Sequence, residues 1–264
     1  MNYVKKALYD EMLSFYHTTL GMEHEDRLRL RGQIGHLVRV ARKEIPDTLE
    51  TKAKIHLLLQ LFYGEWGFHC DPESYFLSSN LYLNDVLETR RGMPVSLGAI
   101  LLYIADKLNL PLYPVNFPTQ LVIRAEVEGE VAFINPWDGQ YISQALLHKW
   151  YEGAMGFGMT LTPAELAIAN VGDLLGRFRQ LAKNALIREE KNDEAFCYIA
   201  RLIHYNPEDP YEIRDRGLVL AQMGCYHVAT EDFQYFIDQC PQDPTALLLK
   251  NQLEELKQDT YPIH

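Results

Sequence analysis

Residues 86–108, VLETRRGMPVSLGAILLYIADKL, contain the most regular apolar pattern of the chain and predict a buried central helix. Six apolar side chains recur in it at helical spacing and form a wide stripe: Leu97, Ile100, Leu101, Ile104, Ala105 and Leu108. Pro94 suits the first turn, and we expect Ser96, near the helix start, to satisfy free backbone N–H groups. The sequence Asn109-Leu110-Pro111 then ends the helix, because proline cannot continue it.

The residues after this helix predict antiparallel strands. Residues 120–127 and 131–135 predict two strands, and Glu128-Gly129 between them predicts a hairpin. Residues 112–117 predict a further strand, which Pro114 places at an edge or a bulge. A helix followed by antiparallel strands is typical of an α+β unit, which we assign to residues 69–165.

The residues before the core, 1–68, predict an N-terminal helical region. Apolar residues recur at helical spacing from Leu30 to Ile45, where Pro46 ends the run, and a second helix is expected over 49–62. We interpret His56 as a histidine at the edge of the core and not as a ligand. A short helix is expected over 84–89.

The remaining residues, 170–264, contain an internal repeat of 34 residues. Asn206-Pro207-Glu208-Asp209-Pro210 recurs as Cys240-Pro241-Gln242-Asp243-Pro244. This period indicates tetratricopeptide α-hairpins, in which small residues such as Gly217 let paired helices approach closely. Lys183 stands at the equivalent place in the first, degenerate copy. Two hairpins and a final helix rarely stand alone, so we expect this region to dock on the rest of the chain.

Composition narrows the function classes. The chain has 25 basic and 36 acidic residues and a net charge of −11, which argues against a nucleic-acid surface. We interpret the basic residues between Arg27 and Lys43 as a solvated helix face. The four cysteines are scattered and form no C-x-x-C pair. With no secretory signal, membrane span or phosphate-binding loop in evidence, we expect a cytoplasmic protein without metal, cofactor or membrane association.

Three stretches carry a resemblance to a known family: residues 86–97, 116–124 and 133–139. Taken in this order, they resemble the transglutaminase-like core of the YchA/SirB-type bacterial proteins, and the resemblance extends over essentially the whole chain. It implies a mostly helical α+β protein. Its parts would be N-terminal helices, a transglutaminase/papain-like core of a central helix against a small antiparallel sheet, and C-terminal tetratricopeptide repeats.

The resemblance also implies a site. The wider superfamily places a Cys at the start of the central helix, a His on a following strand and an Asp on the next; here the matching positions hold Ser96, Gln120 and Asn135. The hairpin register sets Gln120 diagonal to Asn135, within side-chain reach. A serine needs an adjacent base, a glutamine amide accepts no proton near neutral pH, and asparagine carries no charge. We therefore expect a pseudoenzyme with no catalytic residues.

Several interpretations of this trio stay open. It is either a polar network that satisfies itself, or a pocket for a small ligand or peptide end, with Arg91 and Trp137 as further ligand-binding candidates. A third interpretation is a serine-dependent amidase, peptidase or acyltransferase that uses Ser96 with an unrecognised base. Salt bridges from Arg90 and Arg91 to Asp85 or Glu88 are the expected alternative to ligand binding. Asp138 is a weak replacement for the lost carboxylate, and Cys70 beside His69 does not make a dyad.

The leading hypothesis is a regulatory or scaffolding protein that binds a protein or peptide through its tetratricopeptide region. Residues 171–264 hold 10 basic and 16 acidic side chains, so a basic segment is the favoured partner. The sequence specifies neither the partner nor the oligomeric state.

Overall fold

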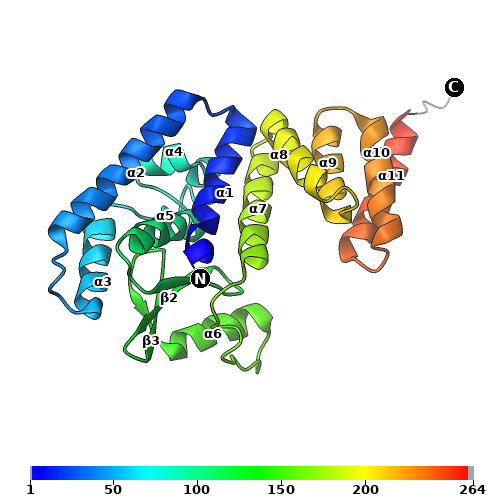
Figure 1. The fold of residues 1–264 in the computed structure, drawn as a ribbon. Coiled ribbons are helices and arrows are strands. Elements are labelled where there is room, and N and C mark those ends of the chain that lie inside the picture. Colours follow the sequence, from blue (N-terminus) through cyan, green and yellow to red (C-terminus); the bar gives the residue numbers. More distant parts are fainter. Residues whose placement is uncertain (1, 261–264) are drawn as a thin grey trace. The chain divides into compact units, whose positions relative to one another are not determined.

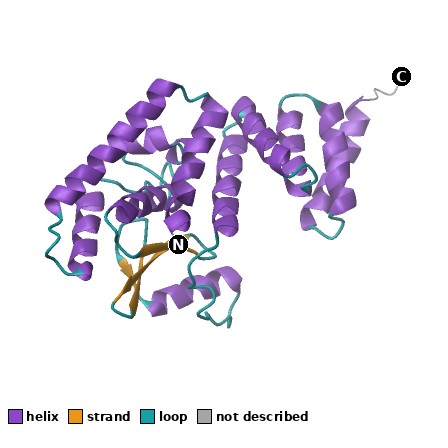
Figure 2. Cartoon of the chain, in the orientation of Figure 1, coloured by secondary structure: helices purple, strands orange, loops and turns teal. Residues whose placement is uncertain are grey.

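The computed structural model describes residues 2–260, which form two compact units. Unit 1 holds residues up to 17 and 22–182, and unit 2 holds residues 18–21 and 183 onward. The described residues form eleven α-helices and one four-stranded antiparallel sheet. Figure 2 distinguishes the helices, in purple, from the strands, in orange. The predicted α+β class, mostly helical with a small antiparallel sheet, is confirmed.

Three N-terminal helices precede the sheet: α1 (Asn2–Leu20), α2 (His24–Glu44) and α3 (Thr51–Leu59). The second and third belong to unit 1 together with the sheet, and so does α1 up to residue 17. As predicted, α2 buries its apolar stripe and ends just before Pro46. The helix expected over 49–62 departs from prediction, because α3 gives way to a π-helical segment at Gln60–Glu65. Such a segment adds a residue to one turn and is frequent near functional sites.

The central helix forms where the sequence predicts it. After a 3-10 turn (Ser78–Asn80) and α4 (Leu83–Thr89), α5 runs from Pro94 to Lys107, and eleven of its residues are buried. A Cβ on Gly98 would collide with the side chain of Leu121. The absence of a side chain at Gly98 therefore lets α5 lie directly on the sheet.

The sheet has the order β1-β2-β3-β4, with every neighbouring pair antiparallel. Its strands are β1 (Leu112–Asn116), β2 (Leu121–Val127), β3 (Glu130–Ile134) and the short β4 (Tyr141–Ile142), which the sequence did not predict. The strand that contains Pro114 lies at the edge, as expected. Glu128 and Gly129 both have positive φ, the backbone that a tight two-residue hairpin requires.

Helices cover both faces of the sheet, and Figure 1 shows it between α5 and α6 (Gln144–Met155). The face toward α6 carries a cluster of buried residues: Val115, Phe117, Val122, Phe133, Ile142, Leu147 and Tyr151. Leu147 and Tyr151 are the contributions of α6 to this cluster. The sheet is therefore the middle layer of unit 1.

The repeat region is helical throughout: α7 (Val171–Arg188), α8 (Asn192–Tyr205), α9 (Pro210–Gln222), α10 (Tyr226–Gln239) and α11 (Pro244–Thr260). Pro210 and Pro244, 34 residues apart, each begin a helix, and Asp209 and Asp243 accept hydrogen bonds from backbone N–H groups of the first turn. The repeat seen in the sequence is thus a repeat of helix starts. That residues 170–264 dock on the rest of the chain remains a prediction.

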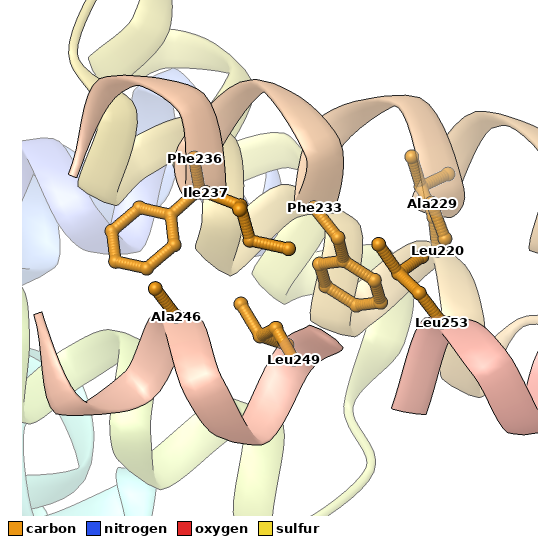
Figure 3. Packing of buried hydrophobic residues seen from close by; sticks show 8 residues of the cluster. All are labelled: Leu220, Ala229, Phe233, Phe236, Ile237, Ala246, Leu249 and Leu253. Atoms are coloured by element: carbon orange, nitrogen blue, oxygen red, sulfur yellow. The ribbon is translucent and has the colours of Figure 1, made fainter. Parts of the chain in front are cut away.

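Close helix packing builds the core of unit 2. A Cβ on Gly217 would lie 2.8 Å from the ring of Phe233, so α9 and α10 meet where glycine leaves room. Figure 3 shows the cluster beyond this contact, in which α10 packs on α11: Leu220, Ala229, Phe233, Phe236, Ile237, Ala246, Leu249 and Leu253.

Lys183, the residue that makes the first repeat copy degenerate, is buried in unit 2. Its ammonium lies 2.8 Å from a carboxylate oxygen of Glu212 and 2.7 Å from one of Asp215. Arg214 donates two hydrogen bonds to the other oxygen of Asp215. In the first repeat copy, the ion-paired Lys183 therefore stands where the second copy has Gly217 in close contact with Phe233.

Candidate functional site

Ser96 is the third residue of α5 and is fully buried. Its hydroxyl lies 2.6 Å from the carbonyl of Asn80 and 3.0 Å from that of Met93, and it donates its proton to this pair of acceptors. The expectation that Ser96 caps free N–H groups is wrong. Because Pro94 takes the first helical position, Met93 becomes the N-cap and Ser96 falls one turn too deep to cap.

The surroundings of Ser96 are tightly packed. A Cβ on Gly92 would lie 2.8 Å from the Ser96 hydroxyl oxygen. The Asn80 side chain donates to the carbonyls of Ser74 and Tyr75, which fixes the segment that accepts from Ser96. The hydroxyl is thus held by backbone carbonyls, which are too weakly basic to take its proton.

Gln120 and Asn135 lie at the same end of the β2–β3 hairpin, directly before β2 and directly after β3. The Gln120 side-chain amide donates to the Asn135 side-chain oxygen over 2.8 Å, and the backbone N–H of Trp137 donates to the same oxygen. The structure therefore brings these two positions together. The hydrogen bonds described for Ser96 lead to Asn80 and Met93, so the three positions form two separate groups.

The turn that follows Asn135 is held by Tyr63, which sequence analysis did not single out. The Tyr63 hydroxyl, on the π-helical segment, donates to the carbonyl of Pro136 over 2.9 Å. Gly139, with φ of +75°, lies so close to the Tyr63 ring that a Cβ would collide with it. Burial, reinforced by Cys70 and Asp138, raises the pKa of Tyr63 well above its usual value, so the hydroxyl remains a donor. The Trp137-Asp138-Gly139 turn in the sequence is the signal that could have indicated a side chain packed against this turn.

The arginines before α5 pair differently from the prediction. Arg91 lies 3.7 Å from Asp71 and not beside Asp85 or Glu88. The reason is that Arg90 is left-handed and ends α4, after which Arg91 pairs with the backbone of His69 in an isolated bridge. The Arg90 guanidinium covers the Phe68 ring at 4.8 Å.

Trp137, the remaining ligand-binding candidate, stacks on Tyr75 with ring centroids 5.4 Å apart. Cys70 is buried nearby. Its burial, followed by the charge of Asp138, raises the pKa of its thiol to about 12. At neutral pH it stays a thiol and is a poor nucleophile. The His69 ring meanwhile bonds the carbonyl of Gly67.

His56 is exposed and not at a buried core edge, which corrects the prediction. It lines a hollow of about 350 Å³ together with Tyr63 and Asp138. Within residues 2–260, the structure shows no group of three or more His, Cys, Asp and Glu side chains that could hold a metal ion. In the same part of the chain, no helix is long and apolar enough to cross a membrane.

Comparison with known proteins agrees with this architecture. Residues 29–180 match the transglutaminase-like superfamily, and residues 182–254 match the tetratricopeptide repeat. The fold therefore defines a transglutaminase-like protein with a tetratricopeptide tail.

Similar bacterial proteins show to which family within this superfamily the chain belongs. The chain is 56% identical to a UPF0162 protein of Haemophilus influenzae over the whole of both chains. It is 41% identical to Protein SirB1 of Salmonella typhimurium and 39% identical to the UPF0162 protein YchA of Escherichia coli K12, each over 88% of this chain and 87% of the relative. No solved structure matches. The chain belongs to the UPF0162/SirB1 family.

Proposed function

We propose that the protein is a non-catalytic, regulatory or scaffolding member of its family that binds a protein or peptide through its tetratricopeptide unit. The observation that carries this proposal is the hydrogen bond between two side-chain amides, Gln120 and Asn135, at the place where the superfamily has its base and carboxylate.

The chemistry of the site supports the first half of the proposal. A general base in hydrogen-bond reach contributes roughly 10²–10⁴-fold to the rate of such reactions. The Ser96 hydroxyl donates to backbone carbonyls. Gln120, at the position of the base, donates a hydrogen bond from its side-chain amide to Asn135. Neither group can activate a nucleophile. Ser96 instead stabilises the helix start, and Gln120 and Asn135 stabilise the end of the hairpin.

The surface of unit 2 supports the second half. Tetratricopeptide arrays present extended surfaces that bind peptides. Net negative charge over residues 171–264 favours a basic segment, since complementary charge speeds and orients association. Several large apolar side chains are also exposed, with Leu247 and Leu248 side by side on α11. The partner segment is therefore basic with some apolar residues.

Fluorescence anisotropy tests this partner chemistry. Two labelled peptides share the same leucine and tyrosine positions, but one carries lysine and arginine where the other carries glutamate. The basic peptide is expected to bind, and to bind less tightly when salt is raised from about 50 to 300 mM, because salt screens exposed charges.

A paired variant locates the surface. Leu247→Ser with Leu248→Ser is expected to weaken binding of the basic peptide several-fold, whereas Leu28→Ser, which changes a half-exposed leucine on α2, leaves it unchanged. Equal binding of the acidic peptide, or no binding of either peptide at millimolar concentration, would contradict the proposal.

A further inference from the structure

An uncharged loop follows α6 and carries the most exposed large apolar side chain of the described residues. Residues 155–163, MGFGMTLTP, hold no Asp, Glu, Lys or Arg, and Phe157 is 99% exposed. Gly156 and Gly158 on either side both have positive φ, the backbone of a tight turn. The N–H of Gly158 donates to the Glu152 carboxylate, which anchors this turn to α6. The ring is thus presented at the tip of a held turn.

A hollow lies beside this loop on the α6 side of the sheet. It measures about 340 Å³ and is lined by apolar groups of Val131, Phe133, Leu161, Pro163 and Leu166, with Arg124, Gln144, His148 and Thr162 completing it. For comparison, an apolar cavity of about 150 Å³ accepts benzene. The hollow has room for an aromatic ring and a neighbouring aliphatic side chain.

The charge in the hollow does not select an anion. Arg124 is already paired with Glu126 at 2.7 Å and donates to the carbonyl of Leu166. A paired guanidinium still attracts the face of an aromatic ring. A neutral aromatic side chain is therefore the occupant that fits both the apolar walls and this arginine.

We propose that the occupant is Phe157 of a second copy of this chain, so that two copies exchange their Phe157 rings across a two-fold axis. The ring is exposed and does not fill the hollow of its own chain. Leu161 in the wall follows Phe157 by only four residues, which limits their separation to roughly 14 Å. A protruding ring and a matching hollow this close together suit an isologous dimer, in which both contacts form at once. The uncharged loop lets two acidic chains approach.

The dimer is expected to be weak and reversible. One aromatic side chain buries roughly 150–250 Å². With the half-exposed Met155 and Met159 beside it, the interface falls in the size class of weak, transient complexes, which bury less than about 1,200 Å² in total. Association is therefore expected at micromolar to submillimolar concentration.

Sedimentation equilibrium of the full chain from about 1 to 500 µM tests the association. A monomer–dimer equilibrium is expected, and Phe157→Ser should weaken it at least tenfold with an unchanged circular dichroism spectrum, because Phe157 packs against nothing in its own chain. Leu28→Ser, which removes a half-exposed leucine elsewhere on unit 1, serves as the control and should not change it. A monomer throughout, or an equal dissociation constant for Phe157→Ser, would overturn the proposal.

Photo-crosslinking identifies the occupant of the hollow. Phe157 is replaced by p-benzoylphenylalanine, and ¹⁴N- and ¹⁵N-labelled chains are mixed before irradiation. Mixed-isotope crosslinks to peptides containing Phe133 or residues 161–166 are expected. Crosslinks only within one isotope would show that the ring reaches its own hollow, and crosslinks to other surfaces would show a different dimer; either result refutes the exchange.

Discussion

Lys183→Ala is expected to lower the unfolding free energy of unit 2 by about 3–5 kcal/mol, which is the usual cost of removing one partner from a buried ion pair. The ammonium of Lys183 is the cation that Glu212 and Asp215 share. Without it, Glu212 has lost its ion-pair partner inside the protein. All three tryptophans, at 66, 137 and 150, lie in unit 1, so tryptophan fluorescence follows unit 1 alone. Both units are helical, so the part of the far-ultraviolet circular dichroism transition that departs from the fluorescence transition reports unit 2.

The loss of unfolding free energy caused by Lys183→Ala should also depend on pH. Burial raises the pKa of Glu212 even with the lysine present. Removing the lysine raises this pKa further, so the folded variant takes up a proton more readily than the unfolded chain. Stability linked to Glu212 is then present at low pH and is lost as pH rises through the folded pKa. We therefore expect Lys183→Ala to lose more unfolding free energy, relative to the wild type, at pH 8 than at pH 5. Lys191→Ala, at a partly exposed ion pair with Glu189, is the control and should cost less than about 1 kcal/mol.

Gly139→Ala is expected to lower the unfolding free energy of unit 1 by about 2–4 kcal/mol. Left-handed backbone at a non-glycine residue costs roughly 1–3 kcal/mol, and forcing a methyl group against the Tyr63 ring costs a similar amount. Because Tyr63 holds the carbonyl of Pro136, the turn that contains Trp137 should move, and tryptophan fluorescence should report both effects.

Gly129→Ala separates the two causes. Gly129 has φ of +84°, but a Cβ there would meet nothing within 4 Å. This variant carries the backbone strain without the collision and should be destabilised less than Gly139→Ala. Equal losses in the two variants would mean that Tyr63 does not fix the turn after Asn135.

Much of this fold follows from local patterns in the sequence. The stripe that begins at Leu97 gives α5, the Glu128-Gly129 turn sets the β2–β3 register, and the 34-residue spacing of Pro210 and Pro244 gives the helix starts of unit 2. These features depend on residues within a few turns or one hairpin of each other, where periodicity and turn chemistry are decisive. The contact between Gln120 and Asn135 follows from the same register.

The parts that sequence analysis missed depend on distant partners. The hydroxyl of Ser96 is held by the carbonyl of Asn80, 16 residues away, and no pattern marks a carbonyl as an acceptor. Tyr63 reaches the carbonyl of Pro136 across 73 residues from a π-helical segment that periodicity does not reveal. Lys183, which departs from the repeat pattern, is compensated by carboxylates on α9. Each case required the tertiary structure.

The core site and the surfaces outside it have different roles in the proposed function. The core keeps the superfamily's helix-and-hairpin frame, while the hydroxyl and the two amides within it bind each other or the backbone. We propose that binding uses surfaces outside this frame: the acidic tetratricopeptide unit for a basic partner, and the Phe157 loop for a second copy.

Labelling of the folded protein by a fluorophosphonate probe tests the central claim most directly, because such probes react only with an activated serine hydroxyl. We predict that the wild-type chain is labelled no faster than Ser96→Ala, since the hydroxyl is buried and has no base. Labelling that is rapid in the wild type and disappears in Ser96→Ala would contradict the account and show that the site is catalytic.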